Sequence, residues 1–225
     1  MKKAGLTGLL FLRRKYKSMA RISGKTANET RQHIIDVAYP LFGLKGFDGV
    51  SIQQISVRAE LSKGALYWHF KNKEVLYFEC LKQFRHVLRE KIFIPMLPIT
   101  SPARQLSLFF SGTKDLLKDP EMVDCAAGYF LDMGRGDSAD ITYFRERIFS
   151  ESESFLSEVL EKGREIGRFS FDGQPIPIAR SLWVIMEGCI LQMRRQPAEE
   201  IEETMYALWD VFSKGVGLEM RKEKR

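Results

Sequence analysis

The chain has 225 residues, of which 44% are hydrophobic and 28% charged, a composition typical of a soluble globular protein of one or two domains. Its net charge of +6 is unevenly spread, because residues 1–73 carry 14 Lys+Arg against 4 Asp+Glu, whereas residues 74–225 carry 21 against 25. A basic end on a mildly acidic body favours polyanion binding by that end alone.

Cysteine and histidine usage argues against a metal site, a disulfide framework or a catalytic centre. The cysteines are odd in number, far apart and inside apolar stretches: Cys80, Cys125 and Cys189. This pattern predicts buried, reduced thiols in a cytoplasmic protein that needs no cofactor. The histidines are scattered, at His33, His69 and His86, and the chain has neither a nucleophile motif nor a phosphate-binding loop, so we expect no enzyme.

The first residues imitate a signal peptide without completing one. Met1-Lys2-Lys3 precedes the apolar run 4–12, but Arg13-Arg14-Lys15 follows at once and no small-residue cleavage site appears. The run is also far shorter than the roughly 20 residues that span a bilayer. We expect no membrane contact. Either residues 1–26 form a disordered basic extension, or translation begins at Met19.

A helix over about 27–43 is expected to brace two shorter helices between residues 50 and 73. Ser51 and Gln54 form a capping box, so the first short helix begins at Ile52. Ser62 is a second cap, and the helix over 63–70 turns Leu66 and Phe70 inward at an i, i+4 spacing.

The second short helix leaves Tyr67 and Trp68 on its outer side, an unfavourable surface unless they contact a partner. Lys63 adds charge, Tyr67 and His69 can donate hydrogen bonds to phosphate, and Trp68 can pack on a sugar or a thymine methyl. Periodicity alone also permits a helical hairpin with the aromatics in its core, but the charge distribution favours DNA binding.

These residues resemble the N-terminal signature of the TetR family of bacterial transcriptional repressors. The resemblance is carried by Thr30 to Ala38, Leu41-Phe42, Lys45-Gly46-Phe47 and Ser62 to Lys73. Met19-Ala20-Arg21, the run from Glu29 to Ile34 and the run from Ala65 to Phe70 are most similar to the subgroup that represses multidrug efflux pumps. The resemblance implies an all-α homodimer, with a three-helix bundle containing a helix-turn-helix at 27–73 and a helical ligand-binding and dimerisation domain at 74–225.

By the same resemblance, the second short helix lies in the major groove of a double-stranded DNA operator. The predicted DNA contacts are Ser51, Gln53, Ser62, Lys63, Gly64, Ala65, Tyr67, Trp68, His69 and Lys73. The chain departs from the family at Glu60, where the turn usually carries Gly. A left-handed backbone at a non-glycine residue costs roughly 1 kcal/mol, so the turn is either strained or avoids that region.

The rest of the chain predicts helices alone, over about 73–91, 102–118, 120–133, 139–163, 178–194 and 198–216, with loops at 134–138 and 167–177. We expect the first of them to transmit ligand binding to the DNA-binding end. Aromatic and methionine side chains suit an apolar or aromatic effector, although core packing predicts the same residues. The candidates are Phe84, Leu88, Phe109, Phe110, Met122, Cys125, Phe130, Phe144, Trp183 and Met186.

The last two helices are more apolar than one contact face requires. The resemblance implies that they form a four-helix bundle with a second copy, although a single intramolecular core remains the alternative. The candidate interface residues are Leu182, Ile185, Cys189, Met193, Met205, Leu208, Trp209 and Phe212. The sequence thus predicts a homodimeric repressor of a palindromic operator, released by an effector. A non-specific architectural DNA-binding protein and a TetR-like activator of metabolic genes are the alternatives.

Overall fold

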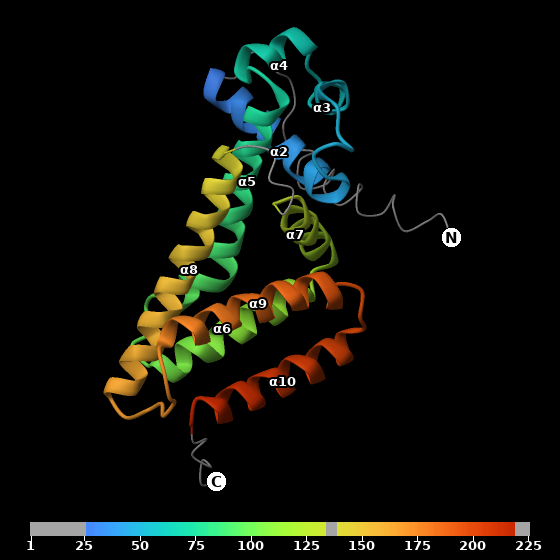
Figure 1. Cartoon of the computed structure of the whole chain (residues 1–225). Coiled ribbons are helices and arrows are strands. Elements are labelled where there is room, and N and C mark those ends of the chain that lie inside the picture. Colours follow the sequence, from blue (N-terminus) through green and yellow to red (C-terminus); the bar gives the residue numbers. More distant parts are fainter. Residues whose placement is uncertain (1–25, 134–138, 219–225) are drawn as a thin grey trace.

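A computed structural model describes residues 26–133 and 139–218, and these residues form helices and no strand, as expected (Figure 1). The predictions about residues 1–25 and about the loop 134–138 lie outside the described residues. The end predicted to bind DNA, which we call the DNA-binding end, contains α2 (Ala27–Lys45), α3 (Ile52–Arg58) and α4 (Lys63–His69). The body contains α5 (Lys73–Leu88), α6 (Pro102–Leu117), α7 (Pro120–Met133), α8 (Ala139–Glu165), α9 (Pro175–Met193) and α10 (Ala198–Gly215).

Several helix boundaries differ from the sequence-based prediction by one to three residues, and two of these differences have a clear local cause. The helix α2 continues past Gly43 to Lys45 and ends at Gly46, whose φ of 71° breaks the helical path. The helix α9 begins at Pro175 rather than Ile178. A proline in the first turn of a helix removes an N–H group that has no intrahelical acceptor, so Pro175 and Pro177 start this helix instead of preventing it.

The end of α5 is irregular where a longer α-helix was expected. The α-helical part stops at Leu88, a π-helical turn η1 (Arg89–Phe93) follows, and a short 3-10 helix η2 (Ile94–Met96) ends the segment. Gln105 of α6 donates a hydrogen bond from Nε2 to the Met96 carbonyl at 3.1 Å, which fixes the end of this segment. The π-helical turn packs on α6 and buries Ile92 and Phe93.

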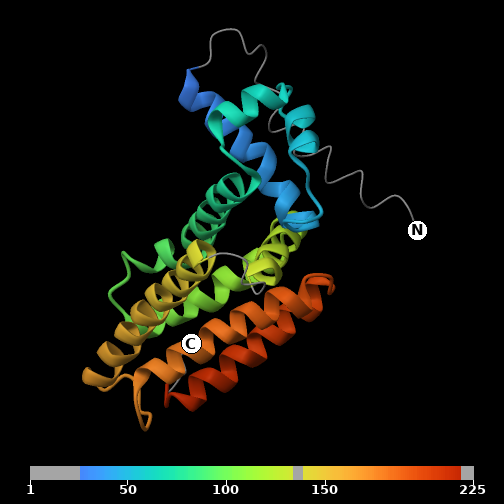
Figure 2. The ribbon, with the colours of Figure 1, turned by 45° about the horizontal axis from the view of Figure 1, so that its top comes forward.

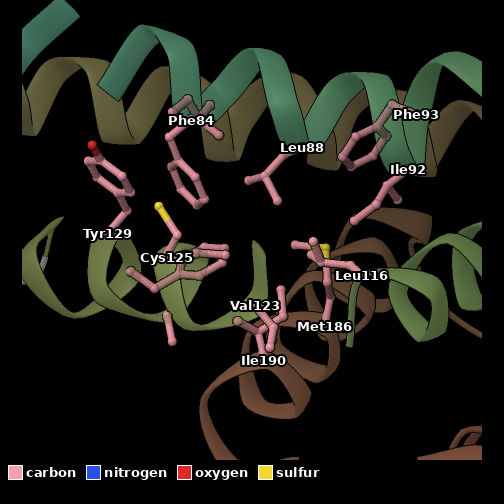
Figure 3. Close-up of a cluster of buried hydrophobic side chains, with 14 of the residues drawn as sticks. Phe84, Leu88, Ile92, Phe93, Leu116, Val123, Cys125, Tyr129, Met186 and Ile190 are labelled. Atoms are coloured by element: carbon pink, nitrogen blue, oxygen red, sulfur yellow. The ribbon is translucent and has the colours of Figure 1, made fainter. Parts of the chain in front are cut away.

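Two views show α9 and α10 running alongside each other at the end of the body farthest from α4, while α5 and α8 lead from there toward α4 (Figures 1 and 2). The helix α10 packs on α6. Among the described residues, α9 alone is long and apolar enough to cross a membrane by length and composition. It packs on α6, α7 and α8, and its inward residues join the core with Phe84, Leu88 and Val123 (Figure 3). That packing accounts for the inward-facing apolar residues of α9, whereas Ile176 and Val184 remain exposed.

The helices α2 and α7 approach each other closely, although they are far apart in the sequence. A Cβ added at Gly128 would lie 1.7 Å from the Gly43 carbonyl oxygen, so the contact requires glycine. Tyr129 donates a hydrogen bond from its hydroxyl to the Tyr39 carbonyl at 2.7 Å. We call this contact the α2–α7 joint and define it by Tyr39, Gly43, Phe47, Cys125, Gly128, Tyr129 and Asp132.

The polar part of the joint holds the loop that follows α2. Asp132 of α7 accepts a hydrogen bond from the Phe47 N–H at 2.5 Å and one from the Tyr77 hydroxyl at 3.4 Å. The joint therefore ties α2, α5 and α7 together.

The cysteines are buried and unpaired, as the sequence predicted: Cys80, Cys125 and Cys189. Burial raises the pKa of the Cys125 thiol to about 12. A buried, protonated thiol is a poor nucleophile, so Cys125 packs in the joint as a small apolar side chain.

Candidate nucleic-acid interface

The helices α3 and α4 begin at the caps that the sequence predicted. The Ser51 hydroxyl accepts the Gln54 N–H at 3.2 Å, while the Gln54 side-chain oxygen accepts the Ser51 N–H at 2.8 Å. The Ser62 hydroxyl accepts the Ala65 N–H at 3.1 Å. These local bonds fix where each helix starts.

The turn between the two helices contains a strained residue. Glu60 has a φ of 58°, in the left-handed region. The turn is closed by a hydrogen bond from the Leu61 N–H to the Ser56 carbonyl at 2.9 Å. Of the two expectations for this position, the strained one is correct: Glu60 adopts the conformation for which glycine is better suited, at a cost of about 1 kcal/mol.

The helix α4 has a buried side that fixes its rotation about its own axis. Leu66 and Phe70 are fully buried, and the Arg31 guanidinium of α2 lies 4.9 Å from the centre of the Phe70 ring. The opposite side of α4 therefore has to face outward. It carries Tyr67, which is 50% exposed, and Trp68, which is 73% exposed.

An indole this exposed leaves a large apolar surface in water, which is unusual for a monomeric protein surface. The Trp68 ring has an edge contact with the His69 ring, with 4.6 Å between ring centres. Partial burial and the nearby Arg31 charge lower the pKa of His69. The outer face of α4 thus presents an aromatic ridge beside a less basic imidazole.

Most predicted contact residues are accessible to a partner. Ser51, Gln53, Ser62, Lys63, Gly64, Tyr67 and Trp68 are exposed, whereas Ala65 and His69 are half-buried. Lys73 is different, because its ammonium donates hydrogen bonds to the carbonyls of Phe47 at 3.0 Å and Val50 at 3.1 Å. It also lies 4.0 Å from the Phe47 ring centre. We therefore correct the prediction for Lys73: it holds the loop after α2 and is not presented for a phosphate contact.

The sequence interpretation missed three exposed residues near α4: Val57, Arg58 and Lys71. Val57 follows Gln53 by one helical turn and shares its face of α3, so the spacing could have identified it. Arg58 and Lys71 add positive charge beside α4, where Glu60 supplies negative charge.

A second candidate site lies in the body, as a cavity of about 280 Å³ bordered by α5, η1, η2, α8 and α9. Its walls are Arg85, Leu88, Arg89, Phe93, Ile94, Leu97, Ile148, Glu151, Ser152, Phe155 and Trp183. Of the predicted effector contacts, Leu88 and Trp183 line this cavity.

The other predicted effector contacts lie outside this cavity. Six of them are buried in the core and do not line the cavity: Phe84, Phe109, Phe110, Cys125, Phe130 and Met186. Met122 and Phe144 are half-buried outside the cavity. Helical periodicity marks the inward side of each helix but does not distinguish a packed core from a cavity wall. The arginines at the mouth were missed, although Arg85 and Arg89 are one turn apart beside an apolar stripe.

Three of the eight candidate interface residues on α9 and α10 need correction. Leu182, Cys189 and Met205 are buried inside the protomer, so a second copy cannot contact them without rearrangement. The other five candidates are half-buried: Ile185, Met193, Leu208, Trp209 and Phe212. The exposed apolar side chains of these helices are instead Ile176, Val184, Tyr206 and Val211.

Comparisons with known proteins agree with the geometry of the DNA-binding end. Residues 34–80 match the family model described as "Bacterial regulatory proteins, tetR family". The HTH-type transcriptional regulator AcrR of Shigella flexneri is 48% identical over 61 residues, which are 27% of this chain and 28% of AcrR. The HTH-type transcriptional repressor DhaR of Mycobacterium sp. (strain GP1) is 26% identical over 175 residues, covering 76% of this chain and 87% of DhaR.

Solved structures share the complete fold at low identity. A TetR transcriptional regulator from Chloroflexus aurantiacus J-10-FL superposes with a TM-score of 0.74 at 20% identity, covering 84% of this chain and 97% of that one. AibR in complex with isovaleryl coenzyme A and operator DNA has a TM-score of 0.67 at 19% identity, covering 80% and 97%. These likenesses extend the shared fold to the body, beyond the strongly similar N-terminal segment.

Proposed function

Because the chain belongs to the TetR family of bacterial regulatory proteins, and is thus a transcriptional regulator and not an enzyme, we propose that it is a ligand-responsive repressor. It binds a palindromic operator as a homodimer and leaves the operator when a small effector occupies the body. Residues 27–73 form the DNA-binding domain, and residues 74–225 form the effector-binding and dimerisation domain.

The exposed aromatic face of α4 is the observation that carries this proposal. Leu66 and Phe70 hold α4 so that Tyr67 and Trp68 project outward. Lys63, Arg58 and Lys71 supply exposed positive charge around them. In a helix-turn-helix protein the second helix enters the major groove, where aromatic and polar side chains contact sugars, phosphates and base edges.

Dimerisation is proposed through the outer surface of α9 and α10. Val184, Tyr206 and Val211 leave apolar surface exposed there. Two α4 helices must reach half-sites about 34 Å apart, which a two-fold dimer achieves with one interface. Sedimentation equilibrium on the full chain tests this step; a monomer at micromolar concentration would remove the dimer.

Release by a ligand is supported by the position of the cavity. It borders α5, the helix that begins directly after the DNA-binding domain. A ligand that binds more tightly when the two DNA-binding ends are placed unsuitably for the operator lowers the affinity of the dimer for DNA. A coupling free energy of about 1–3 kcal/mol changes operator affinity roughly 5- to 150-fold. The AibR structure that holds both a ligand and operator DNA has the same fold, which supports a ligand-responsive mechanism for this chain.

A salt-controlled competition experiment separates a specific repressor from an architectural DNA-binding protein. The full chain is titrated with the DNA upstream of its own gene and with random duplex at the same salt concentration. Specific binding is expected to exceed random binding by roughly 10³-fold or more. A ratio near one would favour an architectural protein, whose basic end binds any duplex with steep salt dependence. A reporter downstream of the selected site then distinguishes repression from activation.

A further inference from the structure

The cavity of the body has a charged mouth and an apolar interior. Phe93, Phe155, Trp183 and Leu88 form apolar wall, whereas Arg85 and Arg89 of the α5 segment supply positive charge, one helical turn apart. Glu151 of α8 is the single acidic residue among the lining residues that the structure describes. This wall therefore favours ligands that carry a negative charge as well as an apolar part.

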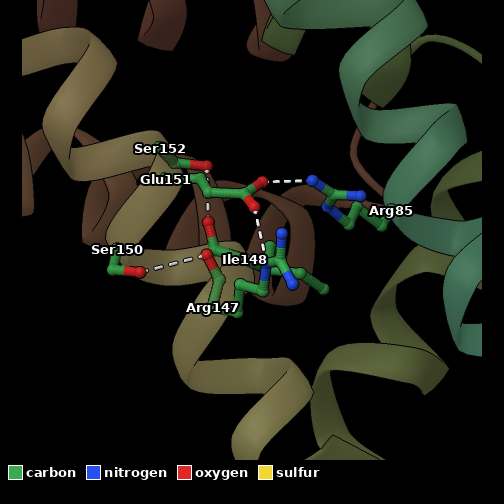
Figure 4. A network of polar contacts seen from close by, with 6 residues as sticks. All are labelled: Arg85, Arg147, Ile148, Ser150, Glu151 and Ser152. Carbon is green, nitrogen blue, oxygen red and sulfur yellow. Dashed lines mark hydrogen bonds and ion pairs between the residues drawn. The ribbon is translucent and has the colours of Figure 1, made fainter.

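The negative charge of Glu151 is already compensated (Figure 4). Its carboxylate forms an ion pair with Arg85, and a second one with Arg147 in which the Arg147 Nε lies 2.9 Å from a Glu151 oxygen. Burial raises the pKa of Glu151, but the hydrogen bonds and charges of the two arginines outweigh that effect and lower it overall. An ionised Glu151 with two arginine partners has little capacity left to attract a cation.

Arg89, unlike Glu151, has no charged partner among the described residues. It lines the cavity and is exposed, and its guanidinium forms no hydrogen bond or ion pair within the described part of the chain. A guanidinium offers several N–H donors in a planar fork that matches a carboxylate. The cavity thus combines a solvent-exposed cation, which has no protein partner among the described residues, with an aromatic wall.

We infer that this cavity binds an amphipathic organic anion, a carboxylate whose head group pairs with Arg89 and whose apolar part lies against Phe93, Phe155 and Trp183. The inference rests on the proposal that this cavity is the effector site. A cavity of about 280 Å³ suits a compact ligand with one ring or a short chain.

The same anion has a route to the DNA-binding end. Arg85 belongs to α5 and Glu151 to α8, so their ion pair ties α5 to α8 at the cavity mouth. A bound carboxylate competes with Glu151 for Arg85 and weakens this tie. Only a short connecting segment separates the end of α4 from the start of α5. A shift of α5 therefore changes the positions that α4 can adopt.

The test uses probes that share an apolar part and differ only in head-group charge. Calorimetric titration of the full chain, without DNA, compares 4-phenylbutyrate with 4-phenylbutanol and 4-phenylbutylamine, and octanoate with octanol and octylamine. In at least one series, the carboxylate is expected to bind about tenfold more tightly than the alcohol, because it gains charge-assisted hydrogen bonds. The amine is expected to bind most weakly.

Three variants assign the preference to the named residues. Arg89→Gln is expected to weaken carboxylate binding about tenfold and to leave alcohol binding unchanged. Glu151→Gln is expected to strengthen carboxylate binding, because Arg85 loses its competing partner. Arg104→Gln is the matched control, since Arg104 is an exposed arginine of α6 outside the cavity wall and the net charge changes equally.

The outcomes separate this inference from the proposed function. The inference is wrong if neither carboxylate binds at millimolar concentration, if alcohol or amine binds as tightly, or if Arg89→Gln has no more effect than Arg104→Gln. Operator titration is then repeated with saturating carboxylate. A carboxylate that binds through Arg89 but leaves operator affinity unchanged refutes ligand-driven release and leaves the anion site intact. A neutral ligand that binds as tightly as its carboxylate and releases operator refutes the anion preference and supports the repressor.

Discussion

The outer face of α4 belongs to the DNA-binding end, whereas the α2–α7 joint connects that end to the body, and the two are stabilised in opposite ways. The α4 face leaves Tyr67 and Trp68 in solvent, where they contribute little to folding. The joint brings Gly43 and Gly128 so close that a single added methyl would collide with backbone. The binding surface is therefore set by local sequence signals, whereas its position relative to the body is set by a long-range contact.

This difference limits how the DNA-binding end can move. It is joined to the body through the continuous chain into α5 and through the packing of α2 on α7. The joint has little room for sliding because glycine backbones are in contact there. A ligand acting on α5 therefore has to carry α2 and α7 along as one unit, or open the joint.

The largest effect is expected from Gly128→Ala in the joint. The new Cβ would lie 1.7 Å from the Gly43 carbonyl oxygen, so α7 has to move away from α2. We expect the free energy of unfolding to fall by about 3 kcal/mol, as in other overpacked cores. Urea denaturation measures it, and Leu131→Ala, at an exposed position of the same helix, should change it by less than about 0.5 kcal/mol. Equal stability of the two variants would contradict the close contact.

The next effect concerns DNA binding and leaves folding untouched. Trp68→Ala removes the exposed indole, and we expect operator affinity to fall roughly 10- to 100-fold, corresponding to about 1–3 kcal/mol. The melting temperature should stay the same, because the side chain is 73% exposed. Tyr143→Ala is the control, since it removes an aromatic side chain of similar exposure from α8. A loss of stability together with affinity would place Trp68 in the core instead.

The same contrast explains how much could be predicted from sequence. Ser51, Ser62 and Gln54 act within a few residues, so the starts of α3 and α4 and the outward direction of Trp68 follow from spacing. The joint depends on residues about 85 positions apart, such as Gly43 and Gly128, and nothing local marks their meeting. Most of the predicted effector residues lie outside the cavity for a related reason. Phe84 and Leu88 share one face of α5, but only Leu88 reaches the cavity.

A smaller effect tests the hydrogen bond within the joint. Tyr129→Phe removes the bond of 2.7 Å from the buried hydroxyl to the Tyr39 carbonyl. We expect the free energy of unfolding to fall by about 1 kcal/mol, the usual net contribution of such a bond. Tyr67→Phe is the control on α4, where the hydroxyl that is removed is exposed. We expect this variant to keep the same free energy of unfolding and to bind the operator less tightly. Two variants with identical denaturation curves would show that the hydroxyl contributes nothing to the joint.

The smallest effect is expected at Glu60, where the turn that positions α4 is both strained and acidic. Glu60→Gly relieves the left-handed backbone, whose φ is 58°, but glycine also gains freedom in the unfolded chain. The two contributions partly cancel, so we expect a gain below about 1 kcal/mol in the free energy of unfolding. Glu60→Gln keeps the strain and removes the charge, so it should raise operator affinity without the gain in stability. If Gly and Gln raise operator affinity equally, charge alone accounts for the effect; if Gly lowers it, the strained turn itself holds α4 in position for DNA.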